Sequence, residues 1–443
     1  MNIGIIGSGN VGLITGACFA DVGNSVFCYD IDLGKIKNLN EGIVDIYEVG
    51  LARLINKNLN SSIFFENHID GLMSKCDIIF LTVGTPMSDS GETNMDYIYK
   101  AAELIGEKIN DKKIIITKST IPVGQTHEIK KIIQKKIDNR KVSVEFEIAN
   151  NPEFLKEGKG ISDFMSPDRI IVGIDNDNLK NTFESLYRPF SVNHEKLIFM
   201  DILSSELTKY AANAMLATKI SFMNEISILA EKAGADINNI RKGIGSDRRI
   251  GYNYIYPSVG YGGSCFKKDL NSMVKFSEKL NHSLDIVKAV EKVNLNQKKY
   301  FISKIVNEFE DRGKITGKKF AVWGLSFKPG TNDVRESVSI YLINKILSLN
   351  GKLNVYDPKA NKNIHDIFID TEGLNYFDDK YQATESADAL ILLTEWPEFR
   401  SPDFNLLIKN LKNPIVFDGR NQFNKYDMKK KGFKYFQIGV PLV

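Results

Sequence analysis

Residues 262–269 read Gly-Gly-Ser-Cys-Phe-Lys-Lys-Asp, so that one cysteine stands among glycines, cations and a carboxylate. A thiolate is strongly nucleophilic, and a nearby cation such as Lys268 lowers the pKa of a thiol. These surroundings make Cys265 a candidate for covalent chemistry. Cys18 and Cys28 stand in apolar surroundings instead, which is typical of structural cysteines.

The amino terminus carries glycines with G-x-G-x-x-G spacing at Gly7, Gly9 and Gly12. A buried strand is predicted over residues 1–7, and a helix is predicted to follow and end near Gly23. Glycine lets the backbone turn tightly and approach a pyrophosphate, whose charge then meets the free amides and dipole of the helix. The pattern predicts a dinucleotide site formed by Gly7, Gly9, Asn10, Val11 and Gly12.

A second strand, predicted over residues 25–29, ends at Asp30, which lies 23 residues after Gly7. This is close to the offset of about 20 residues expected for the acid that binds the adenosine ribose. Its carboxylate would accept a 2′-hydroxyl and repel a 2′-phosphate, which favours NAD over NADP. Lys35 and Lys37 keep NADP open as an alternative.

The composition is typical of a soluble cytoplasmic enzyme of 443 residues with room for two or three domains. A net charge of +3 argues against nucleic acid as a partner. The four cysteines and five histidines are dispersed, so neither a metal site nor a disulfide is expected. No apolar run reaches about 18 residues, and the apolar stretch 3–20 lacks the basic leader of a signal peptide.

Strands and helices alternate through the first part of the chain. The predicted strands are 62–66, 77–83, 113–118 and 143–149, and the clearest helices are 95–109 and 124–137. This alternation predicts a doubly wound parallel sheet. Loops 83–86, 119–122 and 150–153 then fall at the carboxyl ends of strands, where such sheets bind ligands, and they bring Thr85 and Thr120 towards the nicotinamide.

Residues 203–234 contain no proline and are rich in Ala, Leu, Ile and Met, so they predict one long helix. Apolar residues on several of its faces favour a homodimer. Lys209 and Asn213 lie four residues apart and share one helix face. Their ammonium and amide groups could stabilise a developing oxyanion. Asp269 likewise lies four residues after Cys265, on one side of a helix predicted to begin near Phe266.

A second α/β unit follows a predicted helix over 284–312. Its strands are expected at 319–324, at a segment ending with Asp357, and at 389–393. This unit lacks G-x-G-x-x-G, so a nucleotide-bearing substrate fits it better than a second dinucleotide. The predicted fold is α/β, with two Rossmann-like doubly wound domains joined by a long central helix. The predicted domains are an NAD-binding Rossmann domain (1–200), a central helical and dimerising domain that carries Cys265 (201–313), and a C-terminal Rossmann-like domain for the nucleotide-bearing substrate (314–443).

Together these motifs resemble the nucleotide-sugar dehydrogenases, whose members oxidise UDP-glucose, GDP-mannose or UDP-N-acetylmannosamine. The resemblance covers essentially the whole chain. Its motifs are residues 7–12, 119–124, 151–158, Lys209 with Asn213, 262–269, and 327–328 leading to 333–337. Two positions depart from the family pattern. Lys267 stands where many members carry proline, and Asn10 replaces a common aromatic residue.

The resemblance implies oxidation of UDP-glucose at C6 to UDP-glucuronate by two NAD and one water. Cys265 would form a thiohemiacetal and then a thioester. The implied catalytic residues are Cys265, Lys209, Asn213, Asp269, Thr120 and Glu153, with Asp269 and Thr120 positioning water and Glu153 acting as acid or base. Besides the glycine loop, the cofactor residues are Asp30, Lys35, Thr85, Thr120, Glu157, Lys268 and Arg335.

The implied substrate residues include cations for the diphosphate or the product carboxylate, and a Tyr- and Gly-rich loop. They are Glu153, Phe154, Leu155, Lys156, Glu157, Lys209, Asn213, Arg249, Tyr254, Ile255, Tyr256, Pro257, Ser258, Gly262, Lys328 and Arg420. By the same resemblance, Arg249 reaches the substrate of a neighbouring subunit, which presumes the dimer.

Three alternatives stay open at this point. The substrate could be GDP-mannose, the closest rival, or a UDP-N-acetylhexosamine. The enzyme could be a β-hydroxyacid dehydrogenase that transfers a single hydride, since these also pair a Rossmann domain with a helix bearing Lys and Asn. The chain could also be an inactive NAD-sensing or scaffold protein, although Cys265, Lys209, Asn213 and Asp269 together argue against that.

Overall fold

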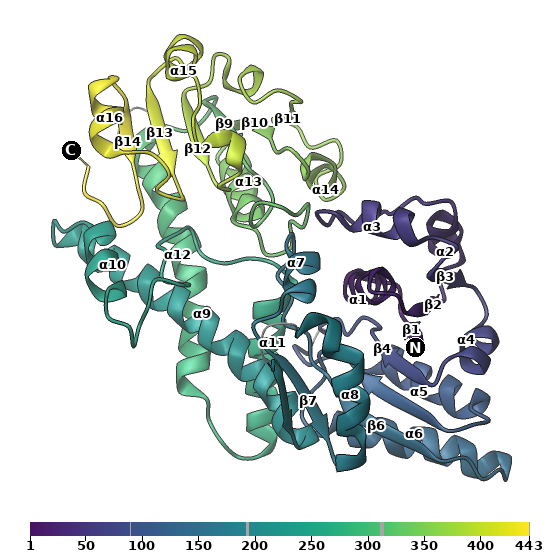
Figure 1. Cartoon of the computed structure of the whole chain (residues 1–443). Helices are drawn as coiled ribbons and strands as arrows, with labels where there is room; N and C mark the ends of the chain where they lie inside the picture. The colour runs from purple at the N-terminus through teal and green to yellow at the C-terminus, as the bar shows by residue number, and fades with distance from the viewer. Residues whose placement is uncertain (89, 192–194, 311–313, 443) are drawn as a thin grey trace. The chain divides into compact units, whose positions relative to one another are not determined.

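The computed structural model describes residues 1–88, 90–191, 195–310 and 314–442. The chain forms two compact units (Figure 1). The first unit comprises Met1–Ala212 with Asn271–His282, and the second comprises Asn213–Leu270 with Ser283–Val443. Helices α9 (Ile202–Lys232) and α11 (Ser264–Lys279) contribute residues to both units.

The described residues of the first unit form an eight-stranded sheet in the order β3-β2-β1-β4-β5-β6-β7-β8. Its strands are β1 (Asn2–Ile6), β2 (Ser25–Tyr29), β3 (Ile63–Glu66), β4 (Ile78–Leu81), β5 (Lys113–Thr117), β6 (Phe146–Asn150), β7 (Ile170–Ile174) and β8 (Leu197–Met200). The first six strands are parallel, in the order typical of dinucleotide-binding domains. The predicted parallel sheet is thus confirmed for these strands.

Strands β7 and β8 extend this sheet in a way that the alternation of elements did not predict. β7 is antiparallel to β6, with Asn150 opposite Gly173, and β8 is parallel to β7. Residues 151–169 hold only the short helix α7 (Gly160–Met165) and turn the chain back along β6. A parallel connection would need a crossover, usually through a longer helix.

Helices cover both faces of the first sheet because its central strands are apolar on both sides (Figure 1). One face packs against α1 (Asn10–Asp21), α2 (Leu33–Asn40), α3 (Leu51–Asn58), α7 and α8 (Lys180–Tyr187). The other packs against α4 (Ile69–Lys75), α5 (Asp96–Lys108) and α6 (Gln125–Arg140). The helices predicted over 95–109 and 124–137 are therefore confirmed as α5 and α6.

The predicted long helix is α9, which runs for 31 residues. It is followed by α10 (Ile237–Gly245), α11 and α12 (Asp285–Glu310). The helix predicted over 284–312 is α12, and its last two predicted residues, 311 and 312, lie outside the described residues. Helix α11 begins at Ser264, two residues before the predicted start, so Cys265 lies inside its first turn.

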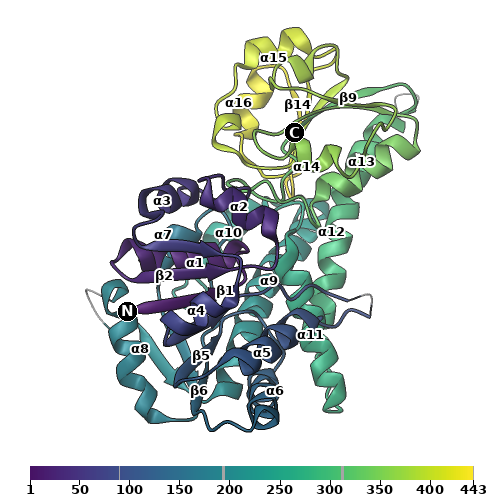
Figure 2. The ribbon, with the colours of Figure 1, turned by 90° about the vertical axis from the view of Figure 1, so that its right-hand side faces the viewer.

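In the described part of the second unit, six parallel strands lie in the order β11-β10-β9-β12-β13-β14. The strands are β9 (Lys319–Trp323), β10 (Lys352–Tyr356), β11 (Leu374–Tyr376), β12 (Ala389–Leu392), β13 (Ile415–Asp418) and β14 (Lys434–Phe436). One face packs on α12, α13 (Val338–Ser348) and α14 (Asn361–His365), and the other on α15 (Phe404–Asn410) and α16 (Lys425–Lys430) (Figure 2). The strand order repeats that of the first six strands, which confirms a second Rossmann-like unit.

A buried carboxylate joins the first two strands of this second sheet. Asp357 follows β10 and is 3% exposed. Its Oδ2 accepts hydrogen bonds from the amides of Leu325 and Ser326 at 2.7 and 3.0 Å, in the loop after β9. The same oxygen accepts the indole N–H of Trp396 at 3.1 Å, and Oδ1 accepts the amide of Lys359 at 2.8 Å. The carboxylate therefore holds three loops together at the carboxyl end of the sheet.

We expect Asp357→Asn to destabilise the second unit by about 3 kcal/mol, because an amide in place of this buried carboxylate leaves N–H donors facing one another. The chain's two tryptophans, Trp323 and Trp396, both lie in this unit, so their fluorescence reports its unfolding alone. The measurement is a urea titration, with Asp366→Asn on an exposed position as control. An unchanged midpoint for Asp357→Asn would contradict this assignment.

Candidate functional site

The glycine loop between β1 and α1 has the backbone geometry of a dinucleotide site. Gly7 has a φ of +103°, and a Cβ built on it would lie 2.8 Å from the backbone of Val83. A Cβ on Gly12 would lie 1.9 Å from the carbonyl oxygen of Gly7, so α1 packs directly against the end of β1. A Cβ on Gly9 would meet no atom within 4 Å. This leaves open space where a pyrophosphate approaches the backbone.

Polar groups around this loop also fit a dinucleotide. Asp30 ends β2, and its carboxylate accepts the amide of Ser8 at 2.7 Å. Lys35 lies 3.2 Å from the same carboxylate and offsets part of its charge. The hydroxyl of Ser8 and the side-chain oxygen of Asn10 are buried without a hydrogen-bond partner among the described residues. These groups lie at the positive end of α1 and could hold the cofactor's diphosphate and ribose.

The loops at the carboxyl ends of β4 and β5 are joined to each other. The hydroxyl of Thr85 donates to the carbonyl oxygen of Thr120 at 2.8 Å, and the hydroxyl of Ser119 donates to that of Val83 at 2.7 Å. The structure therefore brings together Thr85 and Thr120, which the sequence placed near the nicotinamide. Both residues lie at the edge of the sheet where doubly wound folds bind ligands.

Glu153 and Lys209 form a buried ion pair within the first unit. The Lys209 ammonium lies 3.0 Å from a Glu153 carboxylate oxygen, and their side chains are only 6% and 10% exposed. Burial favours the neutral acid, but the Lys209 ammonium and the amide of Leu155 outweigh it and hold the pKa of Glu153 below its usual value. Glu153 is therefore a carboxylate at neutral pH, which favours the predicted role of base over that of acid.

Residues 154–157 form the loop after this pair. The Phe154 ring lies between cations, 4.0 Å from the Arg169 guanidinium and 5.3 Å from the Lys209 ammonium. Lys156 is exposed and pairs with Asp163 at 3.1 Å. Leu155 packs against the core of the first unit, and Glu157 is half-buried. Of these loop residues, Phe154 lies beside Lys209, whereas Lys156 pairs with Asp163, which is not a predicted site residue.

Two buried glutamates that the sequence reasoning missed shape the neighbouring loops. Glu206, one turn before Lys209 on α9, accepts the amides of Gly124 and Thr126 at 2.6 and 2.8 Å and so caps α6. Glu48 accepts the amides of Gly158 and Gly160 at 2.7 and 2.9 Å. Charged residues in otherwise apolar or Gly-rich surroundings were the available signal for both positions.

The cysteine helix belongs to the second unit up to Leu270. Gly262 and Gly263 precede it, and a Cβ on either would lie within 3 Å of the Phe327 side chain. Gly263 has a φ of +83° and donates its amide to the Arg335 carbonyl oxygen at 2.8 Å. Glycine is required here because the loop passes against an aromatic ring. This packing places Cys265, whose thiol is exposed and forms no disulfide, at the start of α11.

Asn213, Lys268 and Asp269 form a buried polar cluster in the same unit. Asn213 donates its amide to Asp269 at 2.6 Å, and the Lys268 ammonium lies 2.9 Å from the other oxygen of that carboxylate. Asp269 and Asn213 are 2% and 7% exposed. Asp269 lies one turn after Cys265 on α11, as predicted, so the thiol and this cluster share one helix.

Thr120, Glu153 and Lys209 belong to the first unit, whereas Asn213, Cys265 and Asp269 belong to the second. Lys209 and Asn213 lie one turn apart on the continuous helix α9. The predicted catalytic residues thus form two groups. The assignment of their roles stays a prediction.

The predicted substrate loop, residues 254–258, lies in the second unit. Ser258 is buried and donates its amide to Asn224 at 2.8 Å, and Ile255 and Pro257 are also buried. Tyr254 has a φ of +62° and is half-buried. Tyr256 is exposed, and its ring lies 3.6 Å from the Arg241 guanidinium. This loop is therefore held at Ser258 and presents Tyr256 to solvent.

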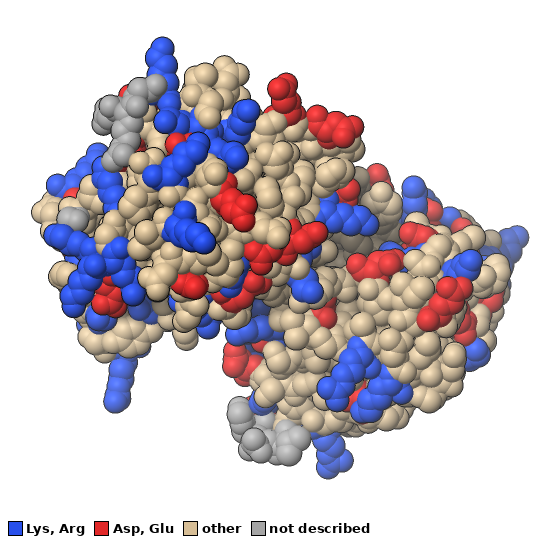
Figure 3. Space-filling view, turned by 90° about the horizontal axis from the view of Figure 1, so that it is seen from above, with Lys and Arg blue, Asp and Glu red and all other residues tan. Residues whose placement is uncertain are grey.

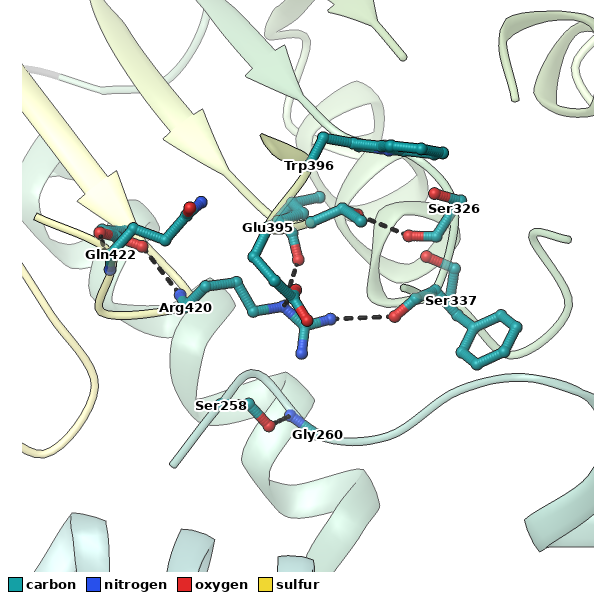
Figure 4. A network of polar contacts seen from close by, with 12 residues as sticks. Ser258, Gly260, Ser326, Ser337, Glu395, Trp396, Arg420 and Gln422 are labelled. Atoms are coloured by element: carbon teal, nitrogen blue, oxygen red, sulfur yellow. Dashed lines mark hydrogen bonds and ion pairs between the residues drawn. The ribbon is translucent and has the colours of Figure 1, made fainter. Parts of the chain in front are cut away.

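Arg420 lies at the centre of a polar network at the carboxyl end of the second sheet (Figure 4). Its Nε donates to the Leu393 carbonyl oxygen at 2.6 Å and lies 3.0 Å from a Glu395 carboxylate oxygen. Its Nη2 donates to the Phe327 carbonyl oxygen at 3.0 Å. Lys328, the other predicted cation, lies next to Phe327, with its ammonium 5.3 Å from that ring. The two cations are therefore presented by neighbouring segments.

Arg249 and Arg335 are both exposed, and each pairs with an aspartate two residues earlier at 2.6 Å, Asp247 and Asp333 respectively. Their predicted contacts with substrate and NAD stay predictions.

The described residues hold no cluster of His, Cys, Asp and Glu that could bind a metal ion. Nor does any helix among them combine the length and apolar character needed to cross a membrane. On the face drawn in Figure 3, basic and acidic side chains are interspersed.

The fold and the site define a dehydrogenase. Its first sheet has a dinucleotide-binding loop, and its second sheet repeats the strand order of a nucleotide-binding domain. Family models of the UDP-glucose/GDP-mannose dehydrogenases match the chain at residues 1–191 (NAD binding domain), 203–296 (central domain) and 321–425 (UDP binding domain). The chain belongs to this family, and its cofactor is NAD.

The chain is similar to proteins named UDP-glucose 6-dehydrogenase. The one from Pseudomonas aeruginosa is 39% identical over 446 residues, which cover 100% of this chain and 98% of that protein. The one from Rhizobium meliloti is 39% identical over 445 residues and all of both chains. The solved structure of a UDP-glucose dehydrogenase from Pyrobaculum islandicum is 29% identical, with a TM-score of 0.88 over 99% of this chain and 98% of that one.

We expect Gly12→Ala and Gly9→Ala to separate folding from cofactor binding. A methyl group on Gly12 collides with Gly7, so this variant should both lower the melting temperature and lose NAD binding. A methyl group on Gly9 meets no protein atom and should spare stability while weakening NAD binding by about tenfold or more, about 1.4 kcal/mol. Calorimetry and thermal unfolding measure the two effects.

Gly243→Ala is the control, because a Cβ there also meets nothing within 4 Å and the residue lies on α10. Normal NAD affinity in Gly9→Ala would contradict the placement of the diphosphate at this loop.

Proposed function

We propose that this protein oxidises UDP-glucose at C6 to UDP-glucuronate, using two NAD and one water and a covalent intermediate on Cys265. The observation that carries the proposal is an exposed thiol at the start of α11, one turn from the buried Asn213–Lys268–Asp269 cluster. Support for the substrate comes from relatives named for UDP-glucose, which are 39% identical over the full chain.

The reaction balances as two hydride removals and one hydrolysis. NAD accepts one hydride in each oxidation. The C6 alcohol first loses a hydride and a proton to give an aldehyde. The Cys265 thiolate then adds to C6, and the resulting oxyanion takes up a proton to give a thiohemiacetal. Loss of a second hydride from C6, with the hydroxyl proton, gives a thioester. Water then attacks C6, the C–S bond breaks, and the carboxylate, the free thiolate and two protons are released.

Each group of buried residues suits one part of this sequence. The amide groups in the first turn of α11 favour the negative charge of a thiolate at Cys265. The Lys209 ammonium can stabilise the oxyanion that forms at C6, while Glu153 holds Lys209 and can accept a proton. Asp269, one turn from Cys265, is our candidate for positioning the hydrolytic water, and the role of Thr120 stays a prediction.

The second sheet is better suited to a nucleotide sugar than to a second dinucleotide. Asp357 occupies the position that Asp30 has in the first sheet, but the loop amides and Trp396 occupy its carboxylate. We assign the diphosphate to Lys328 and Arg420 instead, because both are cations at the carboxyl end of this sheet. The division into domains 1–200, 201–313 and 314–443 and a cytoplasmic location stay predictions.

The test is a panel of UDP-glucose, UDP-N-acetylglucosamine, UDP-N-acetylmannosamine and GDP-mannose with NAD, followed by NADH absorbance and by mass spectrometry of the product. The proposal expects UDP-glucose as the best substrate and two NADH for each sugar consumed. One NADH per substrate would support the single-hydride alternative. Cofactor binding without turnover would support the scaffold alternative.

We expect Cys265→Ser to lose the four-electron turnover by several orders of magnitude while binding NAD normally, because an alkoxide is far less accessible than a thiolate at neutral pH. The measurements are steady-state NADH formation and calorimetry with NAD. Cys76→Ala is the matched control, since burial raises the pKa of that thiol to about 12 and keeps it unreactive. Unchanged turnover in Cys265→Ser would refute the nucleophile.

We also propose a homodimer that forms through α9. Met215, Phe222 and Leu229 recur every seven residues on this helix and are 63%, 53% and 63% exposed. Large apolar side chains repeated along one helix face are typical of a helix that packs against a partner.

We expect Phe222→Glu to convert the dimer to a monomer, because it places a charge in the middle of this apolar stripe. Light scattering coupled to size-exclusion chromatography measures the mass. Tyr426→Glu replaces an equally exposed aromatic residue on α16 and should leave the mass unchanged. A Phe222→Glu protein that keeps the mass of two chains would exclude this interface.

A further inference from the structure

Lys118, directly after β5, is a buried cation that the proposed chemistry does not use. The residue is 4% exposed. Its ammonium donates to the side-chain oxygen of Asn151 at 2.9 Å and lies 5.9 and 5.7 Å from the ring centroids of Phe80 and Phe164. No carboxylate forms an ion pair with it in the described parts of the chain. A buried charge without an ion-pair partner is costly, which makes a functional reason for it worth seeking.

The partner of Lys118 is the residue that starts the loop leading to Glu153. Asn151 is 1% exposed and lies two residues before Glu153. Its amide nitrogen donates to the carbonyl oxygen of Ile171 on β7 at 2.7 Å, and its oxygen also accepts the hydroxyl of Tyr187. Asn151 is thus tied to several elements. Its backbone amide donates to the Thr117 carbonyl oxygen on β5 at 2.9 Å, and Lys118 adds a side-chain bond from the residue after β5.

Lys118 also belongs to the electrostatic environment of the Glu153–Lys209 pair. Burial lowers the pKa of Lys118 to about 8, the Glu153 carboxylate opposes this shift, and the Lys209 ammonium adds to it. Lys118 in turn is one of the groups that lower the pKa of Glu153. Apart from these two, the titratable group nearest in the network is the Tyr187 hydroxyl, which burial keeps protonated. The cluster therefore holds two cations around one carboxylate.

We propose that Lys118 is a positioning residue for the oxidation: it holds Asn151 and hence the Glu153 loop, and its charge attracts the Glu153 carboxylate that pairs with Lys209. This inference rests on the proposed function, in which Lys209 faces the reacting oxygen. Lys118 acts through Asn151 and Glu153 and does not contact the substrate. Loss of its charge leaves Lys209 less well oriented when the oxyanion forms.

The test compares Lys118→Met with the wild type in UDP-glucose oxidation across pH 6 to 10. We expect kcat to fall by about tenfold or more near pH 7, with little change in KM, because a misplaced catalytic group costs chemistry more than binding. The wild-type to variant ratio of kcat should then fall towards one as pH rises through about 8, where Lys118 loses its proton. The ratio cancels titrations that both proteins share.

Two further variants complete the experiment. Lys113→Met is the matched control, because Lys113 is also a buried lysine, at the opposite end of the same strand, and should leave kcat and its pH profile unchanged. Lys118→Gln keeps an N–H donor without the charge, and it serves as the test variant if Lys118→Met does not fold.

The two proposals fail in different ways. A wild-type protein that does not oxidise UDP-glucose would refute the proposed function. If the wild type does oxidise UDP-glucose and Lys118→Met or Lys118→Gln has a normal kcat, the proposed role of Lys118 is overturned. A lowered kcat with a ratio that is the same at every pH would also overturn it, since a loss of packing alone does not titrate.

Discussion

Both units depend on one contact, in which an aspartate at the end of the second strand accepts backbone amides from the loop after the first. In the first unit Asp30 accepts the amide of Ser8, and in the second Asp357 accepts those of Leu325 and Ser326. The contact joins neighbouring parallel strands at their carboxyl ends. Ligands of such folds bind at these carboxyl ends, so this contact positions the loops that bind them.

The two units use this contact differently because their loops differ. The glycines of the first loop leave space at Gly9 and orphaned oxygens on Ser8 and Asn10. In the second unit, buried Leu325 stands where Ser8 does and buried Ser326 stands where Gly9 does. The hydroxyl of Ser326 and the indole of Trp396 both donate to the Asp357 carboxylate oxygen. One Rossmann-like fold therefore keeps space for a dinucleotide, while in the other the matching carboxylate accepts hydrogen bonds from the chain's own Ser326 and Trp396 side chains.

The candidate catalytic residues form two polar clusters with different charge. The cluster of the first unit combines Lys118 and Lys209 with Glu153, and that of the second combines Lys268 and Asn213 with Asp269. The first has an excess of one cation, which suits stabilisation of an oxyanion. The second has one cation and one anion, so its charges cancel. Its carboxylate lies one helical turn from the Cys265 thiol, which suits a role in positioning the hydrolytic water.

The sequence by itself determined the parts of this protein that depend on local spacing. These parts are the glycine series, the acid at the end of the second strand, and the residues four apart on α9 and α11. Each can be located from the period of a strand or a helix alone. Only the tertiary structure decided the antiparallel return of β7, the capping of α6 by Glu206, and the meeting of Lys118 with Asn151. These contacts join residues distant in the chain, and the cost of burying each polar group is met by a partner that no local pattern identifies.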